Sequence, residues 1–131
     1  MDLVSIIIPY YKKKNYISTT INSAISQSYK NIEIIIVYDD ENYDDLKLLE
    51  EIKKKDERIR IIKNKKKMGA GLSRNIGISS STGNYIAFLD ADDTWEADKL
   101  SKQMSFMTDN NYLASHTSYQ IVDEYRNIIG N

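Results

Sequence analysis

The stretch YIAFLDADD at residues 85–93 constrains the fold of this chain more than any other. Five apolar or aromatic residues run directly into three carboxylates, at Asp90, Asp92 and Asp93. An uninterrupted apolar run of this length is typical of a strand buried on both faces, as in the parallel sheets of α/β proteins. Acids that follow such a strand lie at the carboxyl edge of the sheet, where open α/β folds bind ligands. We therefore expect a parallel sheet with an acidic site at its edge.

Three carboxylates within four positions repel one another, so a positive charge has to offset them. The chain contains no cysteine and a single histidine, His116, which excludes a thiolate site and a multi-histidine site. The oxygen donors that remain suit Mn²⁺ or Mg²⁺. We therefore expect the acidic cluster, which includes Asp92 and Asp93, to bind a divalent metal ion or another ligand. The alternative interpretation is that one of these two residues caps the helix that follows.

Apolar patterns elsewhere predict an alternation of strands and helices. Buried strands are expected at residues 3–8, 32–37 and 58–62. Apolar residues at helical spacing predict a first helix with Asn15 as its N-cap, and further helices near residues 46–52, 72–80 and 97–107. This alternation favours parallel strands joined by right-handed crossovers. The composition of residues 112–129 favours one or two further strands, and we expect a single domain over residues 1–131.

The chain ends at Gly130 and Asn131, a pair typical of turns. This ending predicts that the last strand stops where a hairpin would begin, and that it lacks its sequential partner. A doubly wound sheet normally carries more structure on its far side. We therefore expect the fold to be truncated at the C-terminus and the chain to be a piece of a longer protein.

Composition and motifs exclude several functional classes. Lys and Arg (18) nearly balance Asp and Glu (19), which argues against binding to nucleic acid through bulk charge. The turn at residues 9–15 contains no glycine, so it is no G-x-G-x-x-G loop, and neither a P-loop nor a G-x-S-x-G motif occurs. No apolar run approaches the roughly 20 residues of a membrane span, and the start lacks a signal-peptide pattern, so we expect a cytoplasmic location.

Polar residues follow three of the predicted strands, and a glycine-containing helix start adds an arginine. If these strands are neighbours in the sheet, the groups meet in one crevice at its carboxyl edge. Arg74 is suited to bidentate contact with phosphate, and a solvated helix face is the alternative for this residue taken alone. The strand-end residues are Pro9, Tyr10, Tyr11, Asp39, Asp40, Asp90, Asp92 and Asp93.

Four motifs, in order, resemble those of the N-terminal nucleotide-sugar-binding part of family 2 glycosyltransferases with the GT-A fold. They are VSIIIPYY at residues 4–11, IEIIIVYDD at 32–40, GAGLSRNIG at 69–77 and GNYIAFLDADD at 83–93. The resemblance covers essentially the whole chain. It implies an α/β, Rossmann-like sheet of mostly parallel strands flanked by helices. It also implies a UDP-linked sugar donor, an acceptor hydroxyl on a glycan or lipid carrier, and transfer with inversion assisted by a metal ion.

The resemblance also implies roles for particular positions. Asp39 would accept a hydrogen bond from the base, and Arg74 would contact the base or the diphosphate. The three residues at the end of the first strand would line the base pocket, and the D-x-D motif would face the ribose and the metal. The implied nucleotide-binding residues are Pro9, Tyr10, Tyr11, Asp39, Arg74, Asp90, Ala91 and Asp92, and the implied metal ligands are Asp92 and Asp93.

The chain departs from the family pattern in two ways. Tyr38 stands where the first of two acids is expected, and Asp40-Glu41 replace a Gly-Ser pair, which changes the loop and leaves the donor open. The base that deprotonates the acceptor in inverting members lies well downstream of D-x-D. We therefore expect no catalytic residue in this chain, and we interpret Asp123 and Glu124 as turn or strand-edge residues.

Alternatives remain open at this point. Residues 90–94 also fit the D-x-D-x-T signature of haloacid-dehalogenase-like phosphatases, with Asp90 as nucleophile and Asp92 as acid/base, although that signature follows the first strand in those enzymes. This chain alone could also bind a nucleoside diphosphate or its sugar without turnover. The lysine-rich tracts 53–55 and 63–67 are interpreted as solvated, with peripheral contact to an anionic membrane as the alternative.

Overall fold

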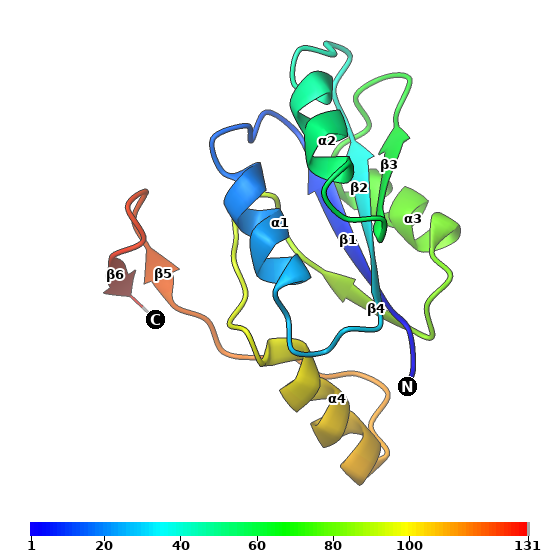
Figure 1. Cartoon of the computed structure of the whole chain (residues 1–131), viewed down its shortest axis with the longest axis vertical. Helices are drawn as coiled ribbons and strands as arrows, with labels where there is room; N and C mark the ends of the chain where they lie inside the picture. The colour runs from blue at the N-terminus through cyan, green and yellow to red at the C-terminus, as the bar shows by residue number, and fades with distance from the viewer. Residues whose placement is uncertain (131) are drawn as a thin grey trace.

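The computed structural model describes residues 1–130 (Figure 1). A parallel sheet with the strand order β3-β2-β1-β4 forms its centre. The strands of this sheet are β1 (Val4–Tyr10), β2 (Ile32–Tyr38), β3 (Ile59–Lys63) and β4 (Tyr85–Phe88). The helices are α1 (Ile17–Ile25), α2 (Leu46–Lys53), α3 (Ala70–Ser80) and α4 (Lys99–Asn110), and a short hairpin of β5 (Ile121–Val122) and β6 (Ile128–Gly130) follows. The predicted α/β fold with a parallel sheet flanked by helices is confirmed.

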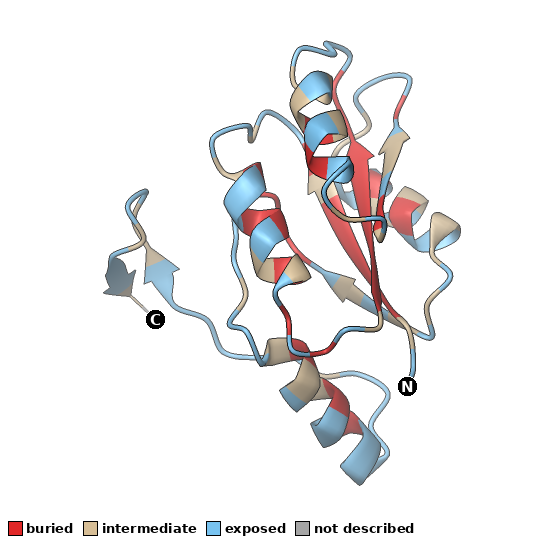
Figure 2. Cartoon of the chain, viewed as in Figure 1, coloured by how far each residue is buried: buried red, intermediate tan, exposed pale blue. Residues whose placement is uncertain are grey.

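Helices cover both faces of the sheet, which explains why β1 and β2 are apolar along their whole length. Helices α1 and α2 lie over one face and α3 over the other (Figure 1). Ile6 and Ile8 of β1 belong to the large apolar cluster that includes residues of α1 and α2. Ile7, between them, faces Gly77 of α3. Both central strands are therefore buried on two sides (Figure 2), as their sequences predict.

Strand β4 is an edge strand, and the prediction that it is buried on both faces is wrong. It pairs with β1 on one side, and its residues alternate between half-buried and exposed. Ile86 is 37% exposed and Phe88 is 50% exposed. Phe88 lies beside Ile7 on the face that α3 covers, but α3 packs over β1 and β2 and does not extend to the edge. The strand ends at Phe88, one residue before the buried Leu89.

Two details of the predicted helix starts are corrected by the structure. Helix α1 begins at Ile17 after Tyr16, and Asn15 is not its cap. The carbonyl of Lys13 accepts hydrogen bonds from the N–H groups of Tyr16 and Ile17 instead, at 3.0 and 2.9 Å. Helix α4 begins after Asp98, so neither acid of the D-x-D region caps it. Across residues 1–130, no helix is long and apolar enough to cross a membrane.

The chain ends in a hairpin, so the prediction that the last strand lacks its sequential partner is wrong. Strand β6 pairs with β5 in antiparallel fashion. The turn between them is closed by Asp123, whose carboxylate accepts hydrogen bonds from the N–H groups of Tyr125 and Asn127, both at 2.9 Å. This agrees with the interpretation of Asp123 as a turn residue. The predicted turn at the chain end includes Asn131, which lies outside the described residues.

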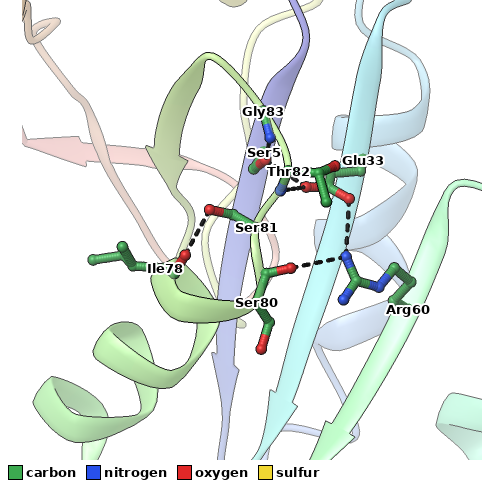
Figure 3. A network of polar contacts seen from close by, with 8 residues as sticks. All are labelled: Ser5, Glu33, Arg60, Ile78, Ser80, Ser81, Thr82 and Gly83. Carbon is green, nitrogen blue, oxygen red and sulfur yellow. Dashed lines mark hydrogen bonds and ion pairs between the residues drawn. The ribbon is translucent and has the colours of Figure 1, made fainter.

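A buried polar network joins the strands at the amino edge of the sheet (Figure 3). Glu33 of β2 is 9% exposed, and its carboxylate accepts hydrogen bonds from the Ser5 hydroxyl (2.6 Å), the Thr82 N–H (2.6 Å) and the Arg60 guanidinium (3.0 Å). Arg60 also donates to the carbonyl of Ser80, the last residue of α3. The network therefore fixes the segment between α3 and β4 against the other three strands.

Candidate functional site

An open cleft of about 300 Å³ lies at the carboxyl edge of the sheet. Three segments that are distant in sequence form it: the end of β1 with the loop that follows, the first turns of α3, and the loop after β4. Its walls are Pro9, Tyr11, Lys13, Arg74, Asp90, Ala91 and Asp92. The structure thus brings together six of the eight residues that the sequence assigned to nucleotide binding. Tyr10 and Asp39 are not among them, and Lys13 was not predicted.

Two cations inside the cleft offset the charge of its acids. The Arg74 guanidinium lies 2.9 Å from the Asp90 carboxylate, and the Lys13 ammonium lies 3.2 Å from the Asp92 carboxylate. The four side chains are between 36% and 52% exposed, so solvent screens both ion pairs. The repulsion that the sequence indicated is therefore relieved within the chain itself. Sequence offered one signal for Lys13, the run of three lysines directly after the first strand.

Asp93 stands apart from the cleft. Its N–H donates to the carbonyl of Asp90 at 3.0 Å, which closes the turn after β4. Partial burial raises the pKa of the Asp93 carboxyl, and the neighbouring carboxylates of Asp92 and Asp90 raise it further. No group of three acidic or histidine side chains that could hold a metal ion occurs in the described part of the chain.

These residues fit a divalent ion that arrives together with a diphosphate better than an ion held by protein alone. Mg²⁺ and similar ions are commonly bound by one or two carboxylates and completed by substrate phosphates and water. The Asp92 carboxylate supplies such an oxygen donor at the cleft wall, with Asp90 nearby. The expected assignment of Asp93 as a second metal ligand stays a prediction.

Asp39 is buried and does not line the cleft, and it organises the start of α3. Its side chain is 2% exposed. One carboxylate oxygen accepts hydrogen bonds from the Met68 N–H (2.7 Å) and the Asn64 side-chain amide (3.0 Å), and the other accepts from the Gly69 N–H (2.8 Å). Gly69 has φ +88°, a backbone conformation that glycine adopts without strain. Asp39 therefore positions the helix that carries Arg74, and its contact with a base stays a prediction.

Tyr10 points away from the cleft, into the core between β1 and α2. Its hydroxyl donates to the Asp45 carboxylate at 2.7 Å, and its ring stacks on Tyr38 with 5.5 Å between the ring centroids. Tyr38 stacks in turn on Tyr43 at 5.9 Å. Burial and the hydrogen bond to Asp45 raise the pKa of Tyr10. The tyrosine that replaces the expected first acid of the second motif is thus the middle ring of a stack.

Tyr11 lies at the mouth of the cleft between two lysines. The Lys67 ammonium is 3.8 Å from its ring centroid, and the Lys12 ammonium is 5.2 Å away. Lys67 belongs to the loop between β3 and α3, so one of the exposed lysines of the tract 63–67 contacts a residue of the cleft wall. The contact joins the two loops that border the cleft, because cation–π attraction holds the ammonium over the ring.

Comparisons with known proteins agree with this geometry. The family model described as "Glycosyl transferase family 2" matches residues 5–129. An uncharacterized glycosyltransferase of Rickettsia felis is 47% identical over 92% of this chain. The Escherichia coli protein named UDP-Glc:alpha-D-GlcNAc-diphosphoundecaprenol beta-1,3-glucosyltransferase WfaP is 44% identical over 95% of this chain. The chain spans 20% of the length of the first relative and 49% of the second.

Solved structures show the same fold. Residues 1–349 of S. aureus TarS in complex with UDP-GlcNAc match with a TM-score of 0.75 and 22% identity, over 82% of this chain and 32% of that one. The mannosyltransferase PcManGT from Pyrobaculum calidifontis, in complex with GDP-Man and Mn²⁺, matches with a TM-score of 0.75 and 17% identity, over 81% of this chain and 32% of that one. Because the family model covers nearly the whole sequence, the resemblance seen in its four motifs is confirmed, and the chain belongs to glycosyl transferase family 2.

Proposed function

We propose that this chain forms the nucleotide-sugar site of a glycosyltransferase that transfers a sugar from a UDP-linked donor to an acceptor hydroxyl with inversion. The observation that carries the proposal is the meeting of Tyr11, Arg74 and the D-x-D motif in one cleft of about 300 Å³. The E. coli relative WfaP is named for a UDP-Glc donor, and TarS was solved with UDP-GlcNAc. Both support UDP as the nucleotide.

Different residues of the cleft would bind the base and the diphosphate of the donor. Pro9 and the ring of Tyr11 offer an apolar wall for the base, since both line the cleft, Pro9 near the end of β1 and Tyr11 directly after it. Arg74 offers a forked donor for the diphosphate, because a guanidinium can contact a carboxylate and a phosphate together. Asp92, with Asp90, would hold a divalent metal ion, which when bound supplies positive charge to the departing nucleoside diphosphate. PcManGT, solved with Mn²⁺, supports that ion.

Inversion requires a base that removes the proton of the acceptor hydroxyl as the sugar is transferred. Asp123 does not fit this role, because its carboxylate is engaged in the hairpin turn. We expect the base in a downstream part of a longer protein, since this chain spans only 20% and 49% of the length of these two curated relatives. This chain alone would then bind the donor without transferring its sugar.

The acceptor is proposed to be a glycan or a lipid-linked sugar at the cytoplasmic face of a membrane. The relative WfaP is named for a diphosphoundecaprenol-linked acceptor. The lysines of the tract 63–67 are exposed, and Lys67 lies over the ring of Tyr11, so the tract could approach anionic headgroups, with about 1 kcal/mol for each residue near the surface. Sedimentation with vesicles that contain anionic lipid, compared with neutral vesicles, tests this contact.

The direct test of the donor site is calorimetric titration of UDP into this chain with and without Mn²⁺. We expect binding that Mn²⁺ strengthens, and a loss of that strengthening in Asp92→Asn. Asp98→Asn is the matched control, because Asp98 is an exposed acid that precedes α4 and lies outside the cleft. The metal assignment would be contradicted if the affinity for UDP were the same with and without Mn²⁺. It would also be contradicted if Mn²⁺ strengthened UDP binding to Asp92→Asn as much as to the Asp98→Asn control. Release of phosphate from a phosphomonoester, abolished in Asp90→Asn, would instead favour the phosphatase alternative.

A further inference from the structure

We propose that Lys13 couples the binding of metal and diphosphate: its ammonium neutralises Asp92 in the free protein and moves to the diphosphate when the metal ion takes that carboxylate. This inference rests on the proposed function, since it assigns a role within the same donor site. Lys13 lies in the cleft wall, and its ammonium is 3.2 Å from Asp92.

The loop between β1 and α1 distinguishes Lys13 from the lysines on either side of it. The carbonyl of Lys13 accepts the N–H groups of Tyr16 and Ile17, which holds the residue at the start of α1. Lys12 has φ +50° and turns its side chain toward the ring of Tyr11. Lys14 is exposed. Among the ion pairs of residues 1–130, Lys13 forms one with an acid of the cleft, and neither neighbouring lysine does.

The charge of the cleft favours joint binding of metal and diphosphate. Its side chains carry two positive and two negative charges, so the free cleft is close to neutral. A divalent ion alone has to approach Asp92 against the Lys13 ammonium, and a diphosphate alone has to approach two carboxylates. Together, their charges nearly cancel, and the ammonium that leaves Asp92 gains a phosphate partner. Each ligand therefore lowers the cost of binding the other, by the same factor in both directions.

Lys13 is better suited than Arg74 to this exchange. The Arg74 guanidinium is a planar fork with five donors, so it can hold Asp90 and contact a phosphate at the same time. The Lys13 ammonium is a compact charge on a flexible stem, and it moves as a unit from one anion to another. An ion pair as exposed as Lys13–Asp92 changes a binding constant by no more than about fivefold, so it can be opened by a competing ligand.

The test measures three binding constants in wild type, Lys13→Gln and the control Lys14→Gln. Electron paramagnetic resonance gives the affinity for Mn²⁺ alone, and calorimetry gives the affinity for UDP with and without saturating Mn²⁺. In Lys13→Gln we expect Mn²⁺ alone to bind about two- to fivefold more tightly, because its competitor is gone. The affinity for UDP should fall more in the presence of Mn²⁺ than in its absence, because the coupling between the two ligands is reduced. Lys13→Arg should keep most of the coupling, and Lys14→Gln should behave like wild type.

The outcomes separate this inference from the function on which it rests. If wild type binds UDP more tightly with Mn²⁺, but Lys13→Gln shows the coupling of the Lys14→Gln control, the role of Lys13 is refuted and the donor site stands. If wild type binds no UDP even with saturating Mn²⁺, the proposed function and this inference both fail. Thermal unfolding of each variant confirms that it is folded, which is expected because the Lys13 side chain is 42% exposed.

Discussion

Gly77 of α3 faces Ile7 of β1 so closely that a methyl group has no room between them. A Cβ atom at position 77 would lie 2.5 Å from Cγ2 of Ile7 and 3.2 Å from its Cγ1. Ile7 is completely buried in β1, an inner strand of the sheet, so it cannot turn aside into solvent. Gly77→Ala therefore forces α3 away from β1 or Ile7 out of its rotamer. Gly71, in the same helix, has no heavy atom within 4 Å of the same position and provides the matched control.

The two variants should change stability in opposite directions. Replacing glycine with alanine where the backbone allows it stabilises a protein by about 0.4–1 kcal/mol, mainly by restricting the unfolded chain. Gly71→Ala should show this gain alone. Gly77→Ala gains the same amount but adds a methyl group to a close-packed contact, which typically costs about 1–3 kcal/mol. We expect Gly77→Ala to lower the free energy of unfolding by about 1–2 kcal/mol, so the two variants should differ by about 1.4–3 kcal/mol.

Urea unfolding followed by circular dichroism measures both free energies under one set of conditions. Because α3 carries Arg74, Gly77→Ala should also weaken UDP binding, whereas Gly71→Ala should leave it nearly unchanged. A Gly77→Ala protein as stable as Gly71→Ala would show that α3 does not approach β1 as closely as the structure has it. The placement of Arg74 opposite Asp90 would then lose its support.

Two further variants test the network at the amino edge and the orientation of Tyr10. Burial alone would raise the pKa of Glu33, but hydrogen bonds from Ser5, Thr82 and Arg60 outweigh it and lower the pKa below its usual value. The ionised carboxylate therefore stabilises the fold at pH values above the usual glutamate pKa, and this contribution disappears as the pH falls through the lower pKa of the folded state. Glu33→Gln should lower the free energy of unfolding by about 1.5–3 kcal/mol at neutral pH. Urea unfolding at a series of acidic pH values should show that the difference between wild type and Glu33→Gln becomes smaller as the pH falls. Tyr10→Phe should cost about 1 kcal/mol in the same assay by removing the bond to Asp45, and should leave UDP binding by calorimetry unchanged. If Tyr10→Phe bound UDP more weakly than wild type, the result would support the prediction that Tyr10 lines the base pocket.

Local sequence patterns were sufficient to predict the strands, the helices and most of the cleft. The apolar runs before Pro9 and Asp39 mark β1 and β2, and parallel strands place the residues that follow them at one edge of the sheet. The orientation of Tyr10 could also have been predicted, since alternate residues of a strand face opposite sides and Pro9 and Tyr11 share the cleft.

The features that sequence did not predict depend on distant segments. The run at 85–89 has the composition of a central strand, and its place at the edge follows from strand order, which no local pattern encodes. Lys13 belongs to a run of three lysines with identical local character. Its pairing with Asp92 depends on how the loop after β4 approaches the loop after β1, across almost 80 residues of chain. The conformation of the loop after β1 and this tertiary contact distinguish Lys13 from Lys12 and Lys14.

Glu33 in β2 and Asp39 directly after β2 explain how Arg74 is held in place at the cleft. Glu33 and Asp39 are six residues apart, about 20 Å along a strand, and α3 has 11 residues, about 16 Å along a helix. Asp39 accepts the N–H groups of Met68 and Gly69 just before α3 begins, and Glu33 accepts the Thr82 N–H just after it ends. Glu33 and Asp39 therefore hold the two ends of α3 through hydrogen bonds. Both carboxylates accept hydrogen bonds from backbone N–H groups next to α3. A substitution that removes either carboxylate should therefore shift α3, and the Arg74 guanidinium would then lose its contact with Asp90.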